Sequence, residues 1–262
     1  RRQRQMCIRD RVAFHYLVGF RRFFLYLHKC ADDSLAVVQG LRRHFDIKVI
    51  VVEPQTNRPQ YAAYTHACEN YLGKVDWMAF IDGDEFLFPV AGQTLEAVLE
   101  QAVAAGPLSA LAVYWACFGS SGHVDEPAGL ILDNYRRRGP LDMAVNRTVK
   151  SLVRGARAGV LVGEDPHVFR TPQGTFDELM RPVECGLSPH PPSHPRLRIN
   201  HYATQSRSHY LRHKQMAELA TGDAGVRYPR PESWWQQMDR NDIPDDSVLH
   251  LMAPLRQLLA GL

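Results

Sequence analysis

The sequence predicts an α/β fold, in which a mostly parallel sheet is flanked by helices and followed by a loop-rich C-terminal half. Three apolar runs at residues 22–27, 47–52 and 75–81 are expected to form buried strands. Residues 35–44 and 61–72, which separate these runs, have the length and composition of helices. Because alternating strands and helices are typical of parallel sheets with helices on their faces, these five segments indicate the fold class.

Further elements are predicted on both sides of this alternation. A helix is expected before it at residues 12–20. After it we expect a helix at 94–105, a strand at 110–116, proline-rich loops over 124–195, a strand from Arg198, a helix at 206–220 and a last helix from about Ser247. The predicted organisation is one domain over residues 12–225 and a helical C-terminal tail over residues 226–262.

The first eleven residues contain five arginines and one aspartate, without an initial methionine or any periodicity. They resemble translated sequencing-adapter read-through, so we expect residues 1–11 to be non-native. A basic arm that contacts phosphates or anionic lipid is the alternative. Without this segment the net charge changes from +3 to −1. That balance argues against a nucleic-acid partner.

The composition is that of a globular protein, with 45% hydrophobic and 23% charged residues. No apolar run approaches the roughly 20 residues that span a bilayer, so this fragment has no expected transmembrane segment. The five cysteines are widely spaced and support neither a disulfide framework nor a zinc site. We expect a cytoplasmic location, with membrane association left open.

Three acidic residues follow the third predicted strand: Asp82, Asp84 and Glu85. Carboxylates at positions i and i+2 leave a strand on the same side, roughly 6–7 Å apart. This spacing suits Mg²⁺ or Mn²⁺, which carboxylates hold together with substrate phosphates. Ligands of parallel sheets bind beyond the carboxyl ends of the strands, where this cluster falls. The alternative is a solvated surface turn.

Two later motifs could complete such a site. His201 ends a short predicted strand, before a basic helix, and an imidazole there could complete a carboxylate metal site. The run from Trp115 to His123 combines aromatic residues with glycines, which could place a flat surface and an approachable backbone against a sugar ring. The alternatives are a core or surface histidine and a tight turn.

Three further polar residues are candidates for donor binding. Asp32 and Asp33 follow the first predicted strand and could bond a ribose or a base edge, with helix capping as the alternative. Gln60 lies at the start of the next helix, where a surface or packing role is the alternative.

In these motifs the chain resembles the glycosyltransferases of family 92 (DUF23) and the related family 2-like group. The matching segments are Asp82–Leu87, Trp115–His123 and Asn200–Ser206, in the family's order and spacing. The resemblance implies a GT-A-like, Rossmann-type fold that is truncated at its N-terminus. It also implies a nucleotide-sugar donor, for which a UDP-sugar is one candidate, together with a carbohydrate acceptor and a Mn²⁺ or Mg²⁺ ion.

The resemblance also implies roles for particular residues. Asp82, Asp84 and His201 would hold the metal, and Asp82 and Gly83 would contact the nucleotide sugar. The general base is left open among Asp165, Glu126, Glu164 and His123, with the acids preferred. Where the family has a lysine, Gln205 stands here, which removes one cation from the supposed phosphate site.

The predicted function is metal-dependent transfer of a hexosyl group to an acceptor hydroxyl, with inversion, in cell-surface polysaccharide synthesis. Two alternatives remain open. One is a metal-dependent nucleotidyl- or phosphotransferase, which also uses paired acids. The other is a catalytically inactive carbohydrate-binding relative.

Overall fold

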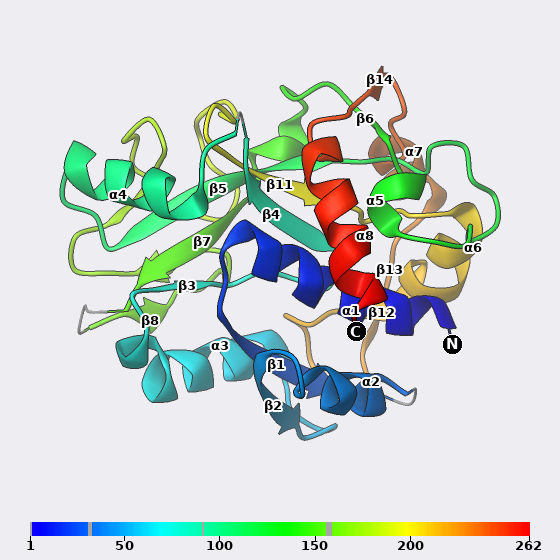
Figure 1. Cartoon of the computed structure of the whole chain (residues 1–262), viewed down its shortest axis with the longest axis horizontal. Coiled ribbons are helices and arrows are strands. Elements are labelled where there is room, and N and C mark those ends of the chain that lie inside the picture. Colours follow the sequence, from blue (N-terminus) through cyan, green and yellow to red (C-terminus); the bar gives the residue numbers. More distant parts are fainter. Residues whose placement is uncertain (1, 31–32, 91, 156–158) are drawn as a thin grey trace. The chain divides into compact units, whose positions relative to one another are not determined.

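The computed structural model describes residues 2–30, 33–90, 92–155 and 159–262, and for residues 2–7 it describes the backbone alone (Figure 1). The chain divides into two compact units. The first unit comprises Arg1–Asn57, Cys117–Pro140 and His201–Leu262, and the second comprises Arg58–Ala116 and Leu141–Asn200. Each unit is described separately.

The first unit begins with helix α1 (Arg2–Val18), strand β1 (Arg22–His28), helix α2 (Ser34–Leu41) and strand β2 (Asp46–Val52). The two strands are parallel and in register from Arg22 opposite Asp46 to His28 opposite Val52. A parallel pair needs a crossover connection, and α2 supplies it. The predicted strand–helix–strand unit is therefore confirmed.

Helix α1 extends further toward the N-terminus than the predicted helix at residues 12–20. It packs against α2 and against the last helix, α8 (Met252–Ala260). Within α1, Asp10, Val12, Ala13 and Phe14 are buried. Burial raises the pKa of Asp10 to about 7.

The rest of the first unit consists of short elements. Two antiparallel pairs join β12 to β13 and β14 to β6. The predicted helix at 206–220 is wrong beyond Lys214, because Met216–Glu218 forms β12. These elements are α5 (Ile131–Asn134), β6 (Arg137–Arg138), α6 (Arg207–His209), η3 (Tyr210–Lys214), β12 (Met216–Glu218), β13 (Arg227–Pro229), α7 (Glu232–Met238), β14 (Ile243–Pro244) and η4 (Leu249–Leu251).

The second unit is built on a six-stranded sheet with the order β3-β7-β5-β11-β4 and β10 paired to β5. Strand β7 is antiparallel to both β3 and β5, whereas β10 is parallel to β5. The α/β fold class is confirmed, and the strand directions in this sheet are mixed. The elements are α3 (Pro59–Asn70), η1 (Leu72–Lys74), β3 (Trp77–Ala79), β4 (Glu85–Pro89), α4 (Leu95–Ala105), β5 (Ala110–Cys117), η2 (Ala144–Arg147), β7 (Val149–Arg154), β8 (Leu161–Val162), β9 (Phe169–Arg170), β10 (Thr175–Asp177) and β11 (Leu197–His201).

The core of the second unit is centred on this sheet. Every residue of β4 is buried, and Ala112 and Tyr114 of β5 pack with Val149, Val168 and Val183. The run Phe86–Phe88 lies in this core, as its apolar sequence predicts. Among the described residues, no helix has the length and apolar character needed to cross a membrane.

Candidate active site

The predicted acidic cluster forms a tight turn between β3 and β4 of the second unit. Glu85 N donates a hydrogen bond to Asp82 O at 3.3 Å, and Asp82 N donates to Glu85 Oε2 at 2.6 Å. Glu85 therefore closes the turn with its backbone and its carboxylate together. As a result Glu85 is buried, while Asp82 and Asp84 remain partly exposed. Gly83, at the tip of the turn, is exposed.

Both carboxylate oxygens of Asp82 accept hydrogen bonds from neighbouring elements. Oδ1 accepts from Gln60 Nε2 at 2.7 Å and from Tyr64 OH at 3.4 Å, both on α3. Oδ2 accepts from Lys150 Nζ on β7 at 2.8 Å. Gln60 Nε2 also lies 3.1 Å from Tyr64 OH. The structure thus brings the predicted residues Gln60 and Asp82 together and fixes the orientation of the Asp82 side chain.

A buried ammonium group balances part of the negative charge of this turn. The Lys150 side chain is 1% exposed, and its Nζ lies 3.8 Å from Glu85 Oε1 as well as beside Asp82. Burial is the largest single influence and would raise the pKa of Asp82, but the charge and the hydrogen bond of Lys150, with smaller contributions, together hold that pKa below its usual range. Burial opposes the charge of Lys150, but the carboxylates of Asp82 and Glu85 raise its pKa above the ordinary value. Both partners are therefore ionised at neutral pH.

Asp165, a predicted general base, lies in the loop between β8 and β9 of the same unit. The residue is exposed, and its Oδ1 accepts a hydrogen bond from His167 N at 2.9 Å. Burial and the charge of Lys150 lower the pKa of His167 to about 4, so its imidazole is neutral at pH 7. His167 Nδ1 lies 3.1 Å from Val149 O, which fixes Nδ1 as the protonated nitrogen of the neutral ring.

His201, the third predicted metal ligand, belongs to the first unit. It is buried at the end of β11, where its Nδ1 lies 3.8 Å from Cys117 Sγ and its carbonyl accepts from Phe118 N at 3.0 Å. Asp82 and Asp84 belong to the second unit. Whether His201 acts with them stays a prediction from the sequence.

The run from Trp115 to His123 begins in β5, and its part from Phe118 to His123 forms a packed turn of the first unit. A Cβ atom at Gly119 would lie 2.5 Å from Asn241 Oδ1, so this glycine permits close packing against the C-terminal segment. Ser120 N and Ser121 N donate to Asp239 and Asn241 at 2.5 and 2.6 Å. His123 Nε2 lies 3.1 Å from Asn134 O. These contacts match the tight-turn interpretation of the sequence.

The other candidates of the first unit have separate surroundings. Glu126 Oε1 accepts from Arg212 Nη2 at 2.9 Å and lies 3.6 Å from His209 Nδ1. Asp33 stands at the N-cap position of α2, where it is exposed and makes no side-chain capping bond. Asp32 lies outside the described residues.

Sequence reasoning missed Lys150, Tyr64 and His167 as parts of this site. Lys150 had a detectable signal, because it stands between apolar residues of β7, Val149 and Leu152–Val153, and must find a counter-charge if that strand is buried. Tyr64 and His167 carry no comparable signal. Their position depends on the packing of α3 and of the β8–β9 loop.

Comparison with known proteins identifies the family. The sequence model of glycosyltransferase family 92 matches residues 3–221. A family 92 protein of Ricinus communis is 29% identical over 151 residues, which is 56% of this chain and 26% of that protein. Another from Oryza sativa subsp. japonica is 25% identical over 198 residues, 76% of this chain and 31% of that protein. The chain thus spans about a quarter to a third of the length of these relatives.

Among solved structures, HddC from Yersinia pseudotuberculosis matches 56% of this chain and 54% of its own, at 13% identity and a TM-score of 0.31. This similarity is too low to carry an argument about the site. The family match, by contrast, covers most of the chain and includes the acidic turn. The chain belongs to glycosyltransferase family 92.

Proposed function

We propose that this chain carries the donor site of a metal-dependent glycosyltransferase, which moves a sugar from a nucleotide-sugar donor to an acceptor hydroxyl. The observation that carries the proposal is the acidic turn, where Asp82 is held by Lys150, Gln60 and Tyr64 in a chain of family 92. A solvated surface turn does not need a buried ammonium group or three oriented donors.

The residues of the turn suit a hard divalent cation. Asp82, Asp84 and Glu85 carry three negative charges when ionised, and Lys150 supplies one positive charge, so these four side chains retain a net charge of −2. Carboxylate oxygens are the ligands that Mg²⁺ and Mn²⁺ prefer. We assign the metal-binding role to the partly exposed Asp84, with Asp82 beside it. A bound cation would offset the charge that develops on the departing diphosphate.

Asp82 has a second role in this proposal, which is to contact the donor together with Gly83. The three donors around Asp82 hold its side chain in one orientation, and an acceptor that is already ordered can bond a ribose hydroxyl without a further loss of its own side-chain entropy. Lys150 stays protonated, so Asp82 remains ionised as an acceptor throughout the neutral pH range.

For the general base we propose Asp165. It is exposed, and it lies in the same unit as the acidic turn. Glu126 is paired with Arg212, and His123 Nε2 is held against the carbonyl of Asn134, where it must be the donor. Both residues belong to the first unit, whereas Asp165 and the acidic turn belong to the second.

The remaining details rest on the family resemblance. They are hexosyl transfer with inversion, a uridine diphosphate carrier, and a place in cell-surface polysaccharide synthesis. A reaction with inversion needs one base and no covalent intermediate, which is consistent with one proposed base.

The test is to incubate the protein with a panel of nucleotide sugars, with and without Mn²⁺, and to measure the release of the nucleoside diphosphate. We expect Mn²⁺-dependent release that falls by roughly 100-fold or more in Asp84→Asn, the size typical of losing an electrostatic stabiliser of the transition state. Asp76→Asn, an exposed aspartate of the same unit, is the matched control and should retain activity. Metal-independent turnover would contradict the proposal. Transfer of a nucleotidyl group would favour the first alternative, and binding of carbohydrate without turnover would favour the second.

A further inference from the structure

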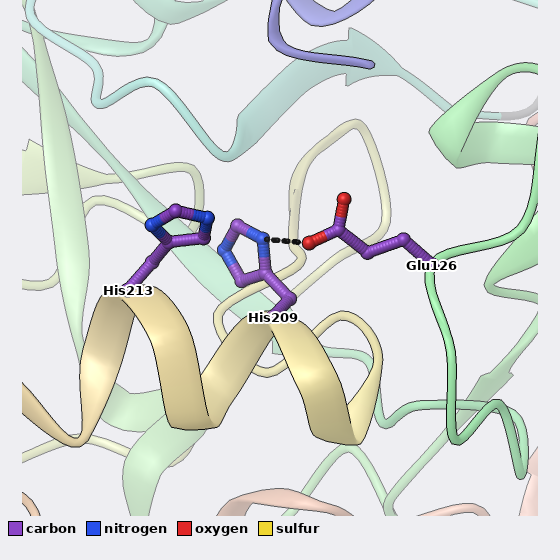
Figure 2. A group of neighbouring side chains, drawn as sticks. All are labelled: Glu126, His209 and His213. Carbon is purple, nitrogen blue, oxygen red and sulfur yellow. Dashed lines mark ion pairs between the residues drawn. The ribbon is translucent and has the colours of Figure 1, made fainter. Parts of the chain in front are cut away.

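A second group of possible metal ligands belongs to the first unit and shares no residue with the proposed donor site. Figure 2 shows Glu126, His209 and His213 with their polar ends turned toward one another. One ligand atom from each residue lies within 4.8 Å of the others. His209 Nδ1 is 3.6 Å from Glu126 Oε1, and the ring centroids of the two histidines are 4.9 Å apart.

Local structure explains why the two histidines face the same side. They are four residues apart across α6 and η3, and η3 is a π-helical turn. Residues four apart lie on one face of a helix, and π-helical turns are found frequently at functional sites. Ser206 begins the helix, and its Oγ accepts from His209 N at 3.1 Å. This cap fixes the turn that carries the first histidine.

Two backbone hydrogen bonds bring Glu126 to this helix. Arg207 N donates to His123 O at 3.0 Å, and Ser208 N donates to Val124 O at 2.8 Å. These bonds attach the loop at residues 123–124 to the start of α6. Glu126 follows two residues later, so its side chain reaches His209.

Two imidazoles and a carboxylate form a ligand set that suits zinc. Protein zinc sites with three protein ligands leave a fourth position for water, and the histidine and carboxylate bonds are roughly 2.0–2.2 Å long. Ligand atoms around tetrahedral zinc are then roughly 3.4 Å apart. The 3.6 Å between His209 and Glu126 is close to this value. The three ligand atoms now lie within 4.8 Å of one another, and rotation of the partly exposed His213 side chain would bring its nitrogen to the tetrahedral spacing.

Arg212 is the competitor for Glu126. Its Nη2 donates to Glu126 Oε1 at 2.9 Å, and its side chain is 58% exposed. Exposed ion pairs contribute only about 0–1 kcal/mol, so a cation can displace this arginine. Arg212 therefore weakens metal binding without preventing it.

We propose that Glu126, His209 and His213 bind one zinc-class divalent cation, which holds the loop at residues 123–126 against the α6–η3 helix. Ser206, Arg207 and Ser208 position the ligands. The proposal rests on these residues alone and does not depend on the proposed glycosyltransferase activity.

The test is titration of the metal-free protein with Zn²⁺ by calorimetry and with Co²⁺ by visible absorption. Both are carried out on an Asp84→Asn chain, so that the acidic turn contributes less to binding. We expect one strong site with tetrahedral Co²⁺ bands, and a loss of affinity of at least about tenfold in His209→Gln and in His213→Gln. His250→Gln, an exposed histidine of the same unit, should bind as the parent does.

A third variant separates ligand loss from unfolding. Arg212→Gln removes the competing cation and keeps every ligand, so it should bind Zn²⁺ more tightly than the parent. Circular dichroism of each metal-free variant checks that the fold is retained. Unchanged affinity in both histidine variants, equal loss in His250→Gln, or weaker binding in a folded Arg212→Gln would each overturn the proposal.

Discussion

The acidic turn of the second unit and the Glu126–His209–His213 cluster of the first unit both gather side chains that we propose as cation ligands, but they balance charge differently. The turn contains a buried ammonium, because the Lys150 side chain is 1% exposed. The cluster has a surface guanidinium, because the Arg212 side chain is 58% exposed. A buried counter-charge is part of the fold, since its removal leaves carboxylates in a poorly solvated site. A surface counter-charge is weak and can be exchanged for an ion.

The largest effect should come from Lys150→Met, which leaves Asp82 and the buried Glu85 without their cation. We expect the free energy of unfolding to fall by about 3–5 kcal/mol, the usual cost of breaking a buried ion pair from one side. Chemical denaturation measures this loss. Lys74→Met, at an exposed lysine of the same unit, should change stability by less than about 0.5 kcal/mol. If the two variants were equally stable, the buried Lys150 would matter no more than a surface lysine, and the contrast between the acidic turn and the Glu126–His209–His213 cluster would not hold.

Glu85→Gln should have the second largest effect on stability. The glutamine keeps an oxygen that can accept from Asp82 N, which the carboxylate does at 2.6 Å, but it loses the charge that faces Lys150. We expect a loss of about 1–3 kcal/mol, because one partner of a buried charged contact is replaced. Denaturation midpoints give the value, and the exposed Glu100→Gln is the control. A loss equal to that of Lys150→Met would mean that the contact of Lys150 with Asp82 adds no stability beyond its contact with Glu85.

A smaller effect should appear in the pH dependence of stability, since Asp82 is partly exposed to screening solvent. Its pKa is lowered on folding, so its contribution is present above the unfolded value of about 3.9 and is lost as pH falls through the folded pKa. The pKa of Lys150 is raised, so its contribution is complete below about 10.4 and is lost as pH rises through the folded pKa.

The stability difference between the parent and Lys150→Met should therefore be steady at neutral pH. It should shrink below about pH 4 and above about pH 10.4. Urea unfolding at a series of pH values measures the difference. If it persisted unchanged at pH 3, the role of Lys150 would be packing and not charge.

Much of the fold could be predicted because apolar periodicity reports which segments are buried. The strands at 22–27 and 110–116 and the helix at 94–105 were found within one or two residues. The mixed strand directions of the second unit's sheet could not be predicted in the same way, because a strand that is buried on both faces gives a continuous apolar run whichever way its neighbours run. The predicted helix at 206–220 was wrong beyond Lys214, where Met216–Glu218 forms a strand that pairs with Arg227–Pro229.

The sequence by itself determined the acidic turn, since three acids between two apolar runs must sit where a strand ends. It also carried the three motifs that identify the family. Only the tertiary structure decided which groups face Asp82 and which residues gather around Glu126. Gln60 and Lys150 are separated from Asp82 by 22 and 68 positions, and His209 is 83 positions after Glu126. Local sequence patterns do not predict such pairs. The packing of distant segments sets the distances over which charges and hydrogen bonds act.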